Sequence, residues 1–217
     1  MRRELFRMSR AQAEALLARA PIVHLATTTP DGAPVLRAVH GVMLADGPDG
    51  PAVAFHGAPA GEKADCIGRP CVLAADEIIA PIPSYFVDPE RACPATTLYQ
   101  SVQVHGTLDE VTDPVAKAAV LAGLMARYQP EGGHVPISAH DPLYRSAVRG
   151  IMIVRVLLTH VDGKAKLGQN RKPHEITQLL ERLHQRGLPG DARAIELVRA
   201  ANPEAPLPPC LGGDGGR

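Results

Sequence analysis

Short runs of apolar and β-branched residues, separated by turn residues, make up most of the chain before residue 160. This pattern predicts strands that are mostly joined by turns. The six predicted strands are 22–28, 33–44, 52–56, 71–75, 98–111 and 150–159. Alternation is clearest in the fifth, where Ser101, Gln103 and His105 share one face. We expect this strand to have one wet or ligand-facing side.

Helical periodicity is confined to the start, one late insertion and the C-terminal part of the chain. Ser9 followed by Gln12 is a capping-box pattern, and Asp113 followed by Pro114 marks another helix start. The predicted helices are 10–20, 114–128, 174–186 and 191–201, with one or two turns within 61–69. The pattern therefore indicates a mainly β fold with peripheral helices, a small six-stranded antiparallel barrel, rather than a Rossmann-type fold.

Prolines and glycines divide the rest of the chain. Residues 77–97 contain four prolines, and since proline donates no backbone hydrogen bond, a long loop is expected there. We expect a cofactor-binding barrel domain with its N-terminal helix at 1–160 and a helical extension packed on the barrel at 161–201. The Pro- and Gly-rich residues 202–217 are expected to form a disordered tail.

Composition narrows the class of partner. The 23 basic and 23 acidic residues leave no positive field for nucleic acid or for an anionic membrane. Aromatic residues are only 3% of the chain, too few for a base-stacking platform. No stretch resembles a signal peptide or a membrane span. We therefore expect a cytoplasmic protein that binds a small-molecule substrate, with neither nucleic acid nor membrane as a partner.

The spacing of cysteine and histidine residues argues against a dedicated zinc or non-haem iron site. The four cysteines lack a CxxC pair and are predicted to be reduced thiols. No HExxH, His-x-x-x-His or 2-His-1-carboxylate spacing occurs. Haem needs only one axial imidazole, so haem is compatible with this sequence where zinc is not.

One segment carries a candidate site. Residues 55–63 read FHGAPAGEK, so His56, two glycines and Lys63 lie where a strand gives way to a helix start. Backbone N–H groups around Gly61 and the Lys63 ammonium suit a phosphate or a carboxylate. His56 could stack on the ligand, hydrogen-bond to it or ligate it. A Gly-rich turn with a solvated lysine and a structural histidine would give the same pattern.

Charged and imidazole side chains also interrupt the predicted strands. Arg37 lies between apolar residues, so it points outward or meets an anion. If the second and third strands are neighbours, Arg37 and Lys63 can approach one phosphate from two directions. His24 and His40 are either packed strand residues or ligands. The basic run 164–172 could contact the rim of an acidic cofactor, cap the following helix or remain solvated.

Three motifs in this order resemble the flavin split-barrel superfamily, that of pyridoxamine-phosphate oxidase. They are PVLRAV at 34–39, FHGAPAGEK at 55–63 and YQSVQVHG at 99–106. The chain is most similar to the nitroimidazole-resistance (Nim) proteins over about residues 10–160. In addition, KLGQNR at 166–171 resembles PaiB-type proteins, whose pattern has serine where this chain has Gly168. The resemblance implies a split barrel that forms a homodimer, with two cofactors between the subunits.

By position, the resemblance implies a flavoprotein with FMN as the cofactor. Arg37 and Lys63 would contact its phosphate, the backbone around Val39 its isoalloxazine, and Ser101 would lie near the ring. The expected cofactor-binding residues are Arg37, Val39, His40, His56, Gly61, Lys63 and Ser101. The implied activity is that of an FMN-dependent oxidoreductase that reduces a small electrophile, such as a nitroaromatic in a nitroreductase-like reaction. Catalytic His56 would orient the substrate or donate a proton.

PaiB-like relatives imply an alternative with the same barrel. They include haem-dependent piperazate synthases, whose axial histidine matches His56 by position. The chain would then be a haem enzyme, with His56 as the metal ligand, acting on an N–O-containing substrate. A third possibility is a non-enzymatic flavin- or haem-binding sensor or regulator. The oxidase's own pyridoxal-phosphate-binding residues have no match here, so that activity is not expected.

Overall fold

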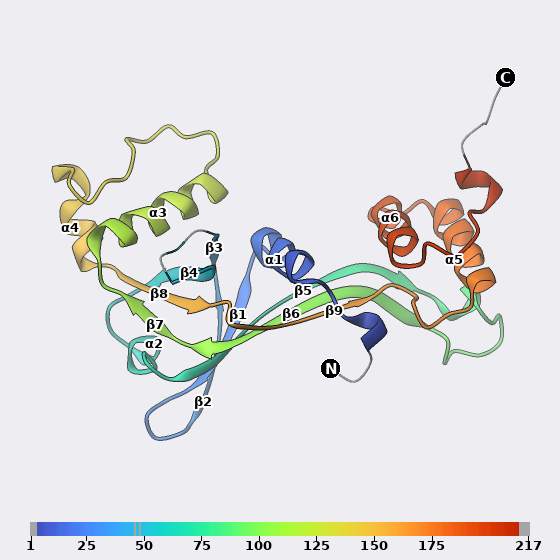
Figure 1. The fold of residues 1–217 in the computed structure, drawn as a ribbon, viewed down its shortest axis with the longest axis horizontal. Helices are drawn as coiled ribbons and strands as arrows, with labels where there is room; N and C mark the ends of the chain where they lie inside the picture. Colours follow the sequence, from blue (N-terminus) through green and yellow to red (C-terminus); the bar gives the residue numbers. More distant parts are fainter. Residues whose placement is uncertain (1–3, 46, 48, 213–217) are drawn as a thin grey trace. The chain divides into compact units, whose positions relative to one another are not determined.

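The computed structural model describes residues 4–45, 47 and 49–212, which form two antiparallel β-sheets with several helices (Figure 1). The strand order is β2-β1-β5-β6-β9 in the first sheet and β3-β4-β8-β7 in the second. The strands are β1 Val23–Thr28, β2 Pro34–Val39, β3 Val42–Leu44, β4 Ala52–Gly57, β5 Pro70–Ile82, β6 Thr96–Thr107, β7 Asp109–Val111, β8 Met152–Leu157 and β9 His160–Lys166. The predicted β class with antiparallel strands and helices is confirmed.

The helices are close to those predicted. They are α1 Arg10–Arg19, α2 Glu62–Asp65, α3 Pro114–Tyr128, α4 Pro142–Gly150, α5 Pro173–Arg186 and α6 Asp191–Ala201, with 3-10 helices η1 Glu4–Phe6, η2 Ser84–Phe86 and η3 Pro209–Leu211. At the start of α3 the Asp113 carboxylate accepts a hydrogen bond from the Ala116 N–H at 2.7 Å. The predicted helix cap is therefore confirmed. Within the described ranges, no helix is long and apolar enough to cross a membrane.

The predicted strand 33–44 is divided between the two sheets. It becomes β2 and β3, with a break at His40 and Gly41. A Cβ at Gly41 would lie 2.9 Å from Val53 Cγ1 and 3.1 Å from Val23 Cγ2, so only glycine fits at this corner. Similarly, the predicted strand 98–111 becomes β6 and β7. The six predicted runs thus correspond to eight of the nine strands in the described residues.

The expectation of a long loop over 77–97 is wrong at both ends of that range. β5 continues to Ile82 and β6 begins at Thr96, so the connection covers only 83–95 and contains η2. Pro81 is tolerated because it lies next to the end of β5 and is exposed, where a missing N–H costs little. Its carbonyl accepts a hydrogen bond from Arg186 Nη1 at 2.7 Å. The proline content alone therefore predicted a longer loop than the structure has.

The first part of the basic run 164–172 is a strand, which the sequence analysis did not predict. β9 extends over His160–Lys166, where Gly163 and Ala165 are buried and Lys164 and Lys166 are half-buried. Two small residues thus alternate with two half-buried lysines. The helix α4 was also missed, although Asp141 followed by Pro142 repeats the start pattern of α3 and the Asp141 carboxylate accepts a hydrogen bond from the Leu143 N–H at 2.8 Å.

The chain divides into two compact units. Unit 1 comprises residues 1–9, 76–101 and 163–217, and unit 2 comprises 10–75 and 102–162. β5, β6 and β9 contribute residues to both units. The predicted domain boundaries remain predictions.

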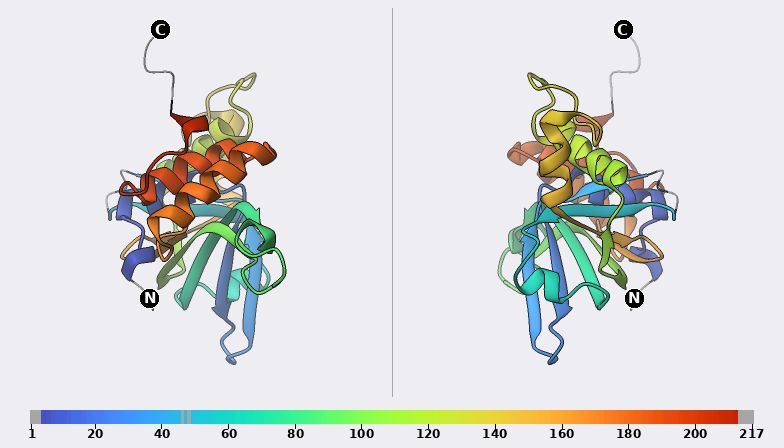
Figure 2. Two further views of the ribbon diagram at one scale, coloured as in Figure 1. Left: turned by 90° about the vertical axis from the view of Figure 1, so that its right-hand side faces the viewer. Right: turned by 90° about the vertical axis from the view of Figure 1, so that its left-hand side faces the viewer.

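In unit 1, α5 and α6 pack against each other (Figure 2). α5 ends at Gly187, whose left-handed backbone with φ 61° suits glycine. The Asn202 amide donates to the Leu167 carbonyl at 3.0 Å and to the Val198 carbonyl at 2.7 Å, which ties the end of α6 to the segment after β9. The described part of the expected tail, 202–212, includes η3, and 213–217 lie outside the described residues.

In unit 2, the second sheet packs against α3. Their shared core consists of Val42, Ala54, Val111, Val120, Leu124 and Ile153. Lys117 is buried in α3, and its ammonium donates to the Ile151 carbonyl at 2.7 Å. A buried lysine needs such a partner, because an unpaired buried charge is costly. The second sheet, with β4 in its interior, is therefore a firm base for the segment that follows β4.

Candidate functional site

The FHGAPAGEK segment begins in the last residues of β4 and continues at the surface of unit 2. Phe55 is fully buried, whereas the next residue, His56, is exposed. β4 pairs antiparallel with β8, with His56 opposite Ile153 and Gly57 opposite Met152. The buried aromatic ring and the strand pairing hold the backbone firmly up to the point where the candidate residues begin.

Gly61 sets the turn that follows. Its φ of 100° and ψ of 179° are accessible in practice only to glycine. Its carbonyl accepts hydrogen bonds from the Ala64 N–H at 2.8 Å and the Asp65 N–H at 3.3 Å. The Ala64 N–H is therefore used within the turn, and α2 is a single turn of four residues. Consequently, side-chain charge contributes more to an anion site here than helix N–H groups do.

The Lys63 ammonium folds back over the end of β4. Its Nζ lies 3.1 Å from the position that a Cβ on Gly57 would occupy, and Met152 Cε lies at the same distance. Because successive side chains of a strand point to opposite faces, Lys63 lies on the face of β4 opposite to the His56 side chain. The two residues thus flank the strand end from its two sides.

Arg37 reaches the same turn from the other sheet. Its Nη2 pairs with Glu62 Oε2, and its Nη1 donates to the Leu36 carbonyl at 2.7 Å. β2 and β4 lie in different sheets, so Arg37 approaches the turn after β4 although the two strands are not paired. The pair is 48% and 40% exposed, and such pairs contribute only about 0–1 kcal/mol. Arg37 can therefore exchange Glu62 for an anionic ligand at little cost.

The other predicted residues lie elsewhere. Val39 is buried at the end of β2, where it pairs with Val23. The His40 ring meets the Tyr128 ring edge-on, with centroids 5.2 Å apart, at the end of α3. Ser101 is half-buried on β6 and belongs to unit 1. The described contacts therefore bring Arg37 to Glu62, between Gly61 and Lys63, and do not bring Val39 or His40 there.

Several side chains of the motif 164–172 bind to other residues of unit 1. Lys164 Nζ lies 5.2 Å from the centroid of the Tyr99 ring, and Lys166 Nζ hydrogen-bonds to Thr96 Oγ1. The Gln169 amide donates to the Ala165 carbonyl at 2.9 Å and accepts from the Leu167 N–H at 2.7 Å. Of the alternatives raised by the sequence, these contacts favour a structural role.

Steric crowding accounts for glycine at position 168, where the PaiB-type pattern has serine. Its φ is 92°, and a Cβ there would lie 2.7 Å from Ile176 Cδ1. A serine would therefore require Ile176 and the turn to rearrange. This departure from the pattern follows from packing against α5.

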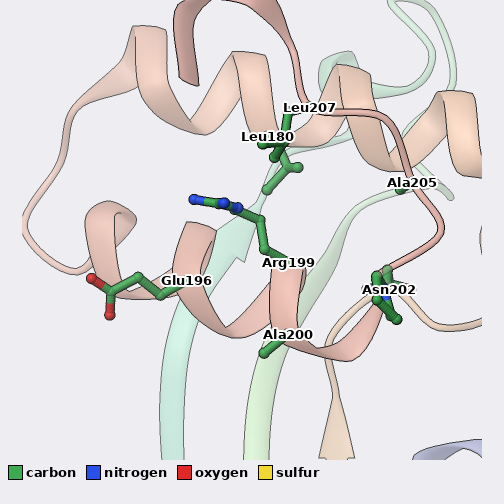
Figure 3. A pocket seen from close by; sticks show the side chains of 8 residues that line it. Leu180, Glu196, Arg199, Ala200, Asn202, Ala205 and Leu207 are labelled. Atoms are coloured by element: carbon green, nitrogen blue, oxygen red, sulfur yellow. The ribbon is translucent and has the colours of Figure 1, made fainter. Parts of the chain in front are cut away.

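A cavity of about 460 Å³ opens in unit 1 on α6 (Figure 3). In Figure 3, Glu196 and Arg199 project from α6, Leu180 comes from α5, and Ala205 and Leu207 come from the segment after α6. None of the predicted site residues lines it. We therefore do not assign it to the candidate site.

All four cysteines are free, as predicted. Cys66 and Cys71 are buried, whereas Cys93 and Cys210 are exposed. Burial raises the pKa of the Cys71 thiol to about 11, and the negative charge of Asp109 adds to the effect. Since the thiolate is the reactive form, Cys71 is unsuited to nucleophilic chemistry near neutral pH.

Alkylation at pH 8 is expected to distinguish these thiols. Iodoacetamide should modify Cys93 and Cys210 in the folded protein, while Cys71 carries only about one thiolate in a thousand at that pH. Peptide mass spectrometry should find all four thiols modified after unfolding in urea. Modification of Cys71 at the rate of Cys93 in the folded protein would contradict the raised pKa.

Sequence reasoning missed one group of polar residues. His105, His160 and Asp162 lie close together in unit 2, although no local spacing links all three. The only sequence signal was the alternation His160-x-Asp162, which places two of them on one face if the segment is a strand.

Comparisons with known proteins agree with this architecture. The family model for pyridoxamine 5'-phosphate oxidase matches residues 9–165. No curated protein sequence matches the chain. Among solved structures, the flavocytochrome Anf3 from Azotobacter vinelandii is similar, with 16% identity, 75% of this chain and 69% of that chain covered, and a TM-score of 0.60.

Two further solved structures share the fold. An FAD- and haem-binding protein from Mycobacterium smegmatis has 16% identity, 73% of this chain and 71% of that chain covered, and a TM-score of 0.58. A candidate 5-nitroimidazole antibiotic resistance protein from Bacteroides thetaiotaomicron has 14% identity, 72% of this chain and 84% of that chain covered, and a TM-score of 0.53.

Proposed function

Because the chain belongs to the pyridoxamine 5'-phosphate oxidase family and has its split-barrel fold, we propose that it is an FMN-dependent oxidoreductase that reduces a small electrophile. Nitroaromatic compounds are the first substrates to test. The observation that carries the proposal is the position of Lys63 over Gly57, beside the turn that Arg37 reaches.

These residues fit the phosphate of FMN. The Lys63 ammonium is a compact positive charge, and the Arg37 guanidinium is a planar fork that matches phosphate oxygens. Gly57 has no side chain to displace Lys63, and Gly61 permits the tight turn beneath it. The turn also carries Glu62, which holds Arg37 when no anion is bound.

The flavin would supply the redox chemistry, and the protein would supply binding and orientation. Lys63 and Arg37 would neutralise the phosphate and hold the cofactor at the end of β4. The His56 side chain is exposed there, and its imidazole hydrogen-bonds to none of the described residues. Its imidazole is therefore available to hold a proton at the substrate or to orient it.

Haem is the second candidate, because two proteins of this fold are described as a flavocytochrome and as an FAD- and haem-binding protein. An exposed, unpartnered imidazole suits axial ligation of iron. In that case His56 would be the ligand, and an N–O-containing compound would be the substrate. Cofactor binding without turnover of any such substrate would support a sensor or regulator instead.

We further propose a cytoplasmic homodimer with the cofactor at the interface between the subunits. Leu36 on β2, next to Arg37, is 61% exposed. A second copy of the chain would cover it.

Absorption spectra of the purified protein test these proposals. After incubation with FMN or with haemin and removal of the excess, His56→Ala is expected to retain flavin absorbance. If haem is the cofactor, the same variant should lose the haem band almost completely, because it lacks the axial ligand. His184→Ala, an exposed histidine on α5, is the matched control. A folded wild-type protein that takes up neither pigment would refute both cofactor proposals.

A further inference from the structure

Three side chains with metal-ligating atoms meet in the first sheet. His105 lies on β6, and His160 and Asp162 lie on β9, its neighbour in the sheet (Figure 1). One ligand atom from each lies within 4.8 Å of the others. All three residues belong to unit 2 and share no member with the candidate cofactor site.

The strand geometry explains how they converge. His160 and Asp162 are two residues apart on β9, so their side chains point to the same face. The His160 Nε2 lies 3.5 Å from Asp162 Oδ2, and the His105 Nε2 lies 3.9 Å from the same oxygen. The two imidazole rings meet edge-on, with centroids 5.2 Å apart. Both imidazoles therefore face one carboxylate oxygen.

These separations are close to those of a metal site. In a tetrahedral zinc site with bonds of about 2.0–2.2 Å, ligand atoms lie about 3.4 Å apart. Small side-chain rotations would suffice to close the group around one ion. The side chains of His105, His160 and Asp162 are 44%, 68% and 45% exposed, so further coordination positions would be open to solvent.

We propose that His105, His160 and Asp162 form a 2-His-1-carboxylate site for a divalent transition metal ion. Two imidazoles select metals such as Zn²⁺, Fe²⁺, Co²⁺ or Ni²⁺ over Mg²⁺ and Ca²⁺, which prefer all-oxygen ligands. With three protein ligands, the remaining positions would accept water or an oxygen or nitrogen donor of a small molecule. The metal would also link β6 to β9.

Metal titration of the full chain tests this site directly. Zn²⁺ is titrated calorimetrically, and Co²⁺ is titrated with its visible d–d absorption as the readout. The wild type is expected to bind one equivalent. His160→Ala and Asp162→Asn should each lower the affinity at least about 10-fold, since even the loss of an outer-shell partner commonly costs that much. His184→Ala should bind as the wild type does.

The exposed thiols of Cys93 and Cys210 are the main competing ligands. Thiolate ligation of Co²⁺ would give a strong near-ultraviolet charge-transfer band, and Cys93→Ser with Cys210→Ser would remove it. The proposal is overturned if binding persists unchanged in His160→Ala and Asp162→Asn, or if the wild type binds no stoichiometric Zn²⁺ or Co²⁺. Circular dichroism of each variant confirms folding, which these exposed substitutions should not alter.

Discussion

Lys63→Ala is expected to weaken FMN binding about 10- to 100-fold. A hydrogen bond to a charged group contributes about 1.5–3 kcal/mol, and each 1.4 kcal/mol changes the affinity about tenfold. Lys63 holds its ammonium over Gly57 at the end of β4. Titration of FMN, followed by quenching of its fluorescence, measures the loss. The prediction follows from the proposed phosphate site.

Two further variants make the Lys63 result specific. Lys172→Ala removes the same charge from an exposed position in unit 1 and should leave FMN affinity unchanged. Glu62→Gln frees Arg37 from its partner and removes a negative charge beside the phosphate, so it should tighten binding severalfold. If Lys63→Ala and Lys172→Ala have equal effects, or if Glu62→Gln weakens binding, the phosphate does not lie at this turn.

Asp191→Asn is expected to lower the free energy of unfolding by about 2–3 kcal/mol, because it leaves the Arg186 guanidinium, whose side chain is 15% exposed, without its charged partner. Asp191 is only 2% exposed, and its carboxylate accepts from Arg186 Nε at 2.9 Å and Nη2 at 2.6 Å. It also accepts from the Leu188 N–H at 2.9 Å. Arg186 in turn donates to the Pro81 carbonyl, so this pair joins the α5–α6 corner to the end of β5. Urea unfolding measures the change.

The same pair predicts a pH dependence. Hydrogen bonds from Arg186 and from the Leu188 N–H hold the pKa of Asp191 below its ordinary value of 3.8. A lowered pKa means that the stabilisation is complete above the pKa of the unfolded chain and is lost as pH falls through that of the folded protein. The difference between wild type and Asp191→Asn should therefore be constant from about pH 5 to 8 and shrink below about pH 4.

Glu204→Gln is the control for the Asp191 experiment, because Glu204 is an exposed carboxylate in the same unit. It should change the stability by less than about 0.5 kcal/mol. A difference between wild type and Asp191→Asn that stays the same at pH 3 and pH 7 would show that the ionised carboxylate is not the source of the stabilisation.

Local patterns predicted the elements whose signals lie within a few residues. Asp113 with Pro114 predicted the start of α3, and the spacing of apolar residues predicted α5 and α6 within about one residue. Short apolar runs predicted β1 and β4, and alternation predicted most of β6. The same reasoning erred where local preference conflicted with the surroundings. Pro81 is accommodated near a strand end, and the small residues of β9 are buried despite the basic side chains beside them.

The candidate site was predictable in part, because His56, Gly57, Gly61 and Lys63 belong to one continuous segment. The sequence by itself thus determined the residue types available at the end of β4 and the conformations that its glycines permit. Only the tertiary structure decided that Arg37 reaches Glu62 from the other sheet and that His105 meets His160 and Asp162. Periodicity reports which face of its own strand a side chain occupies, whereas the order of strands in a sheet is set by packing between segments far apart in the chain.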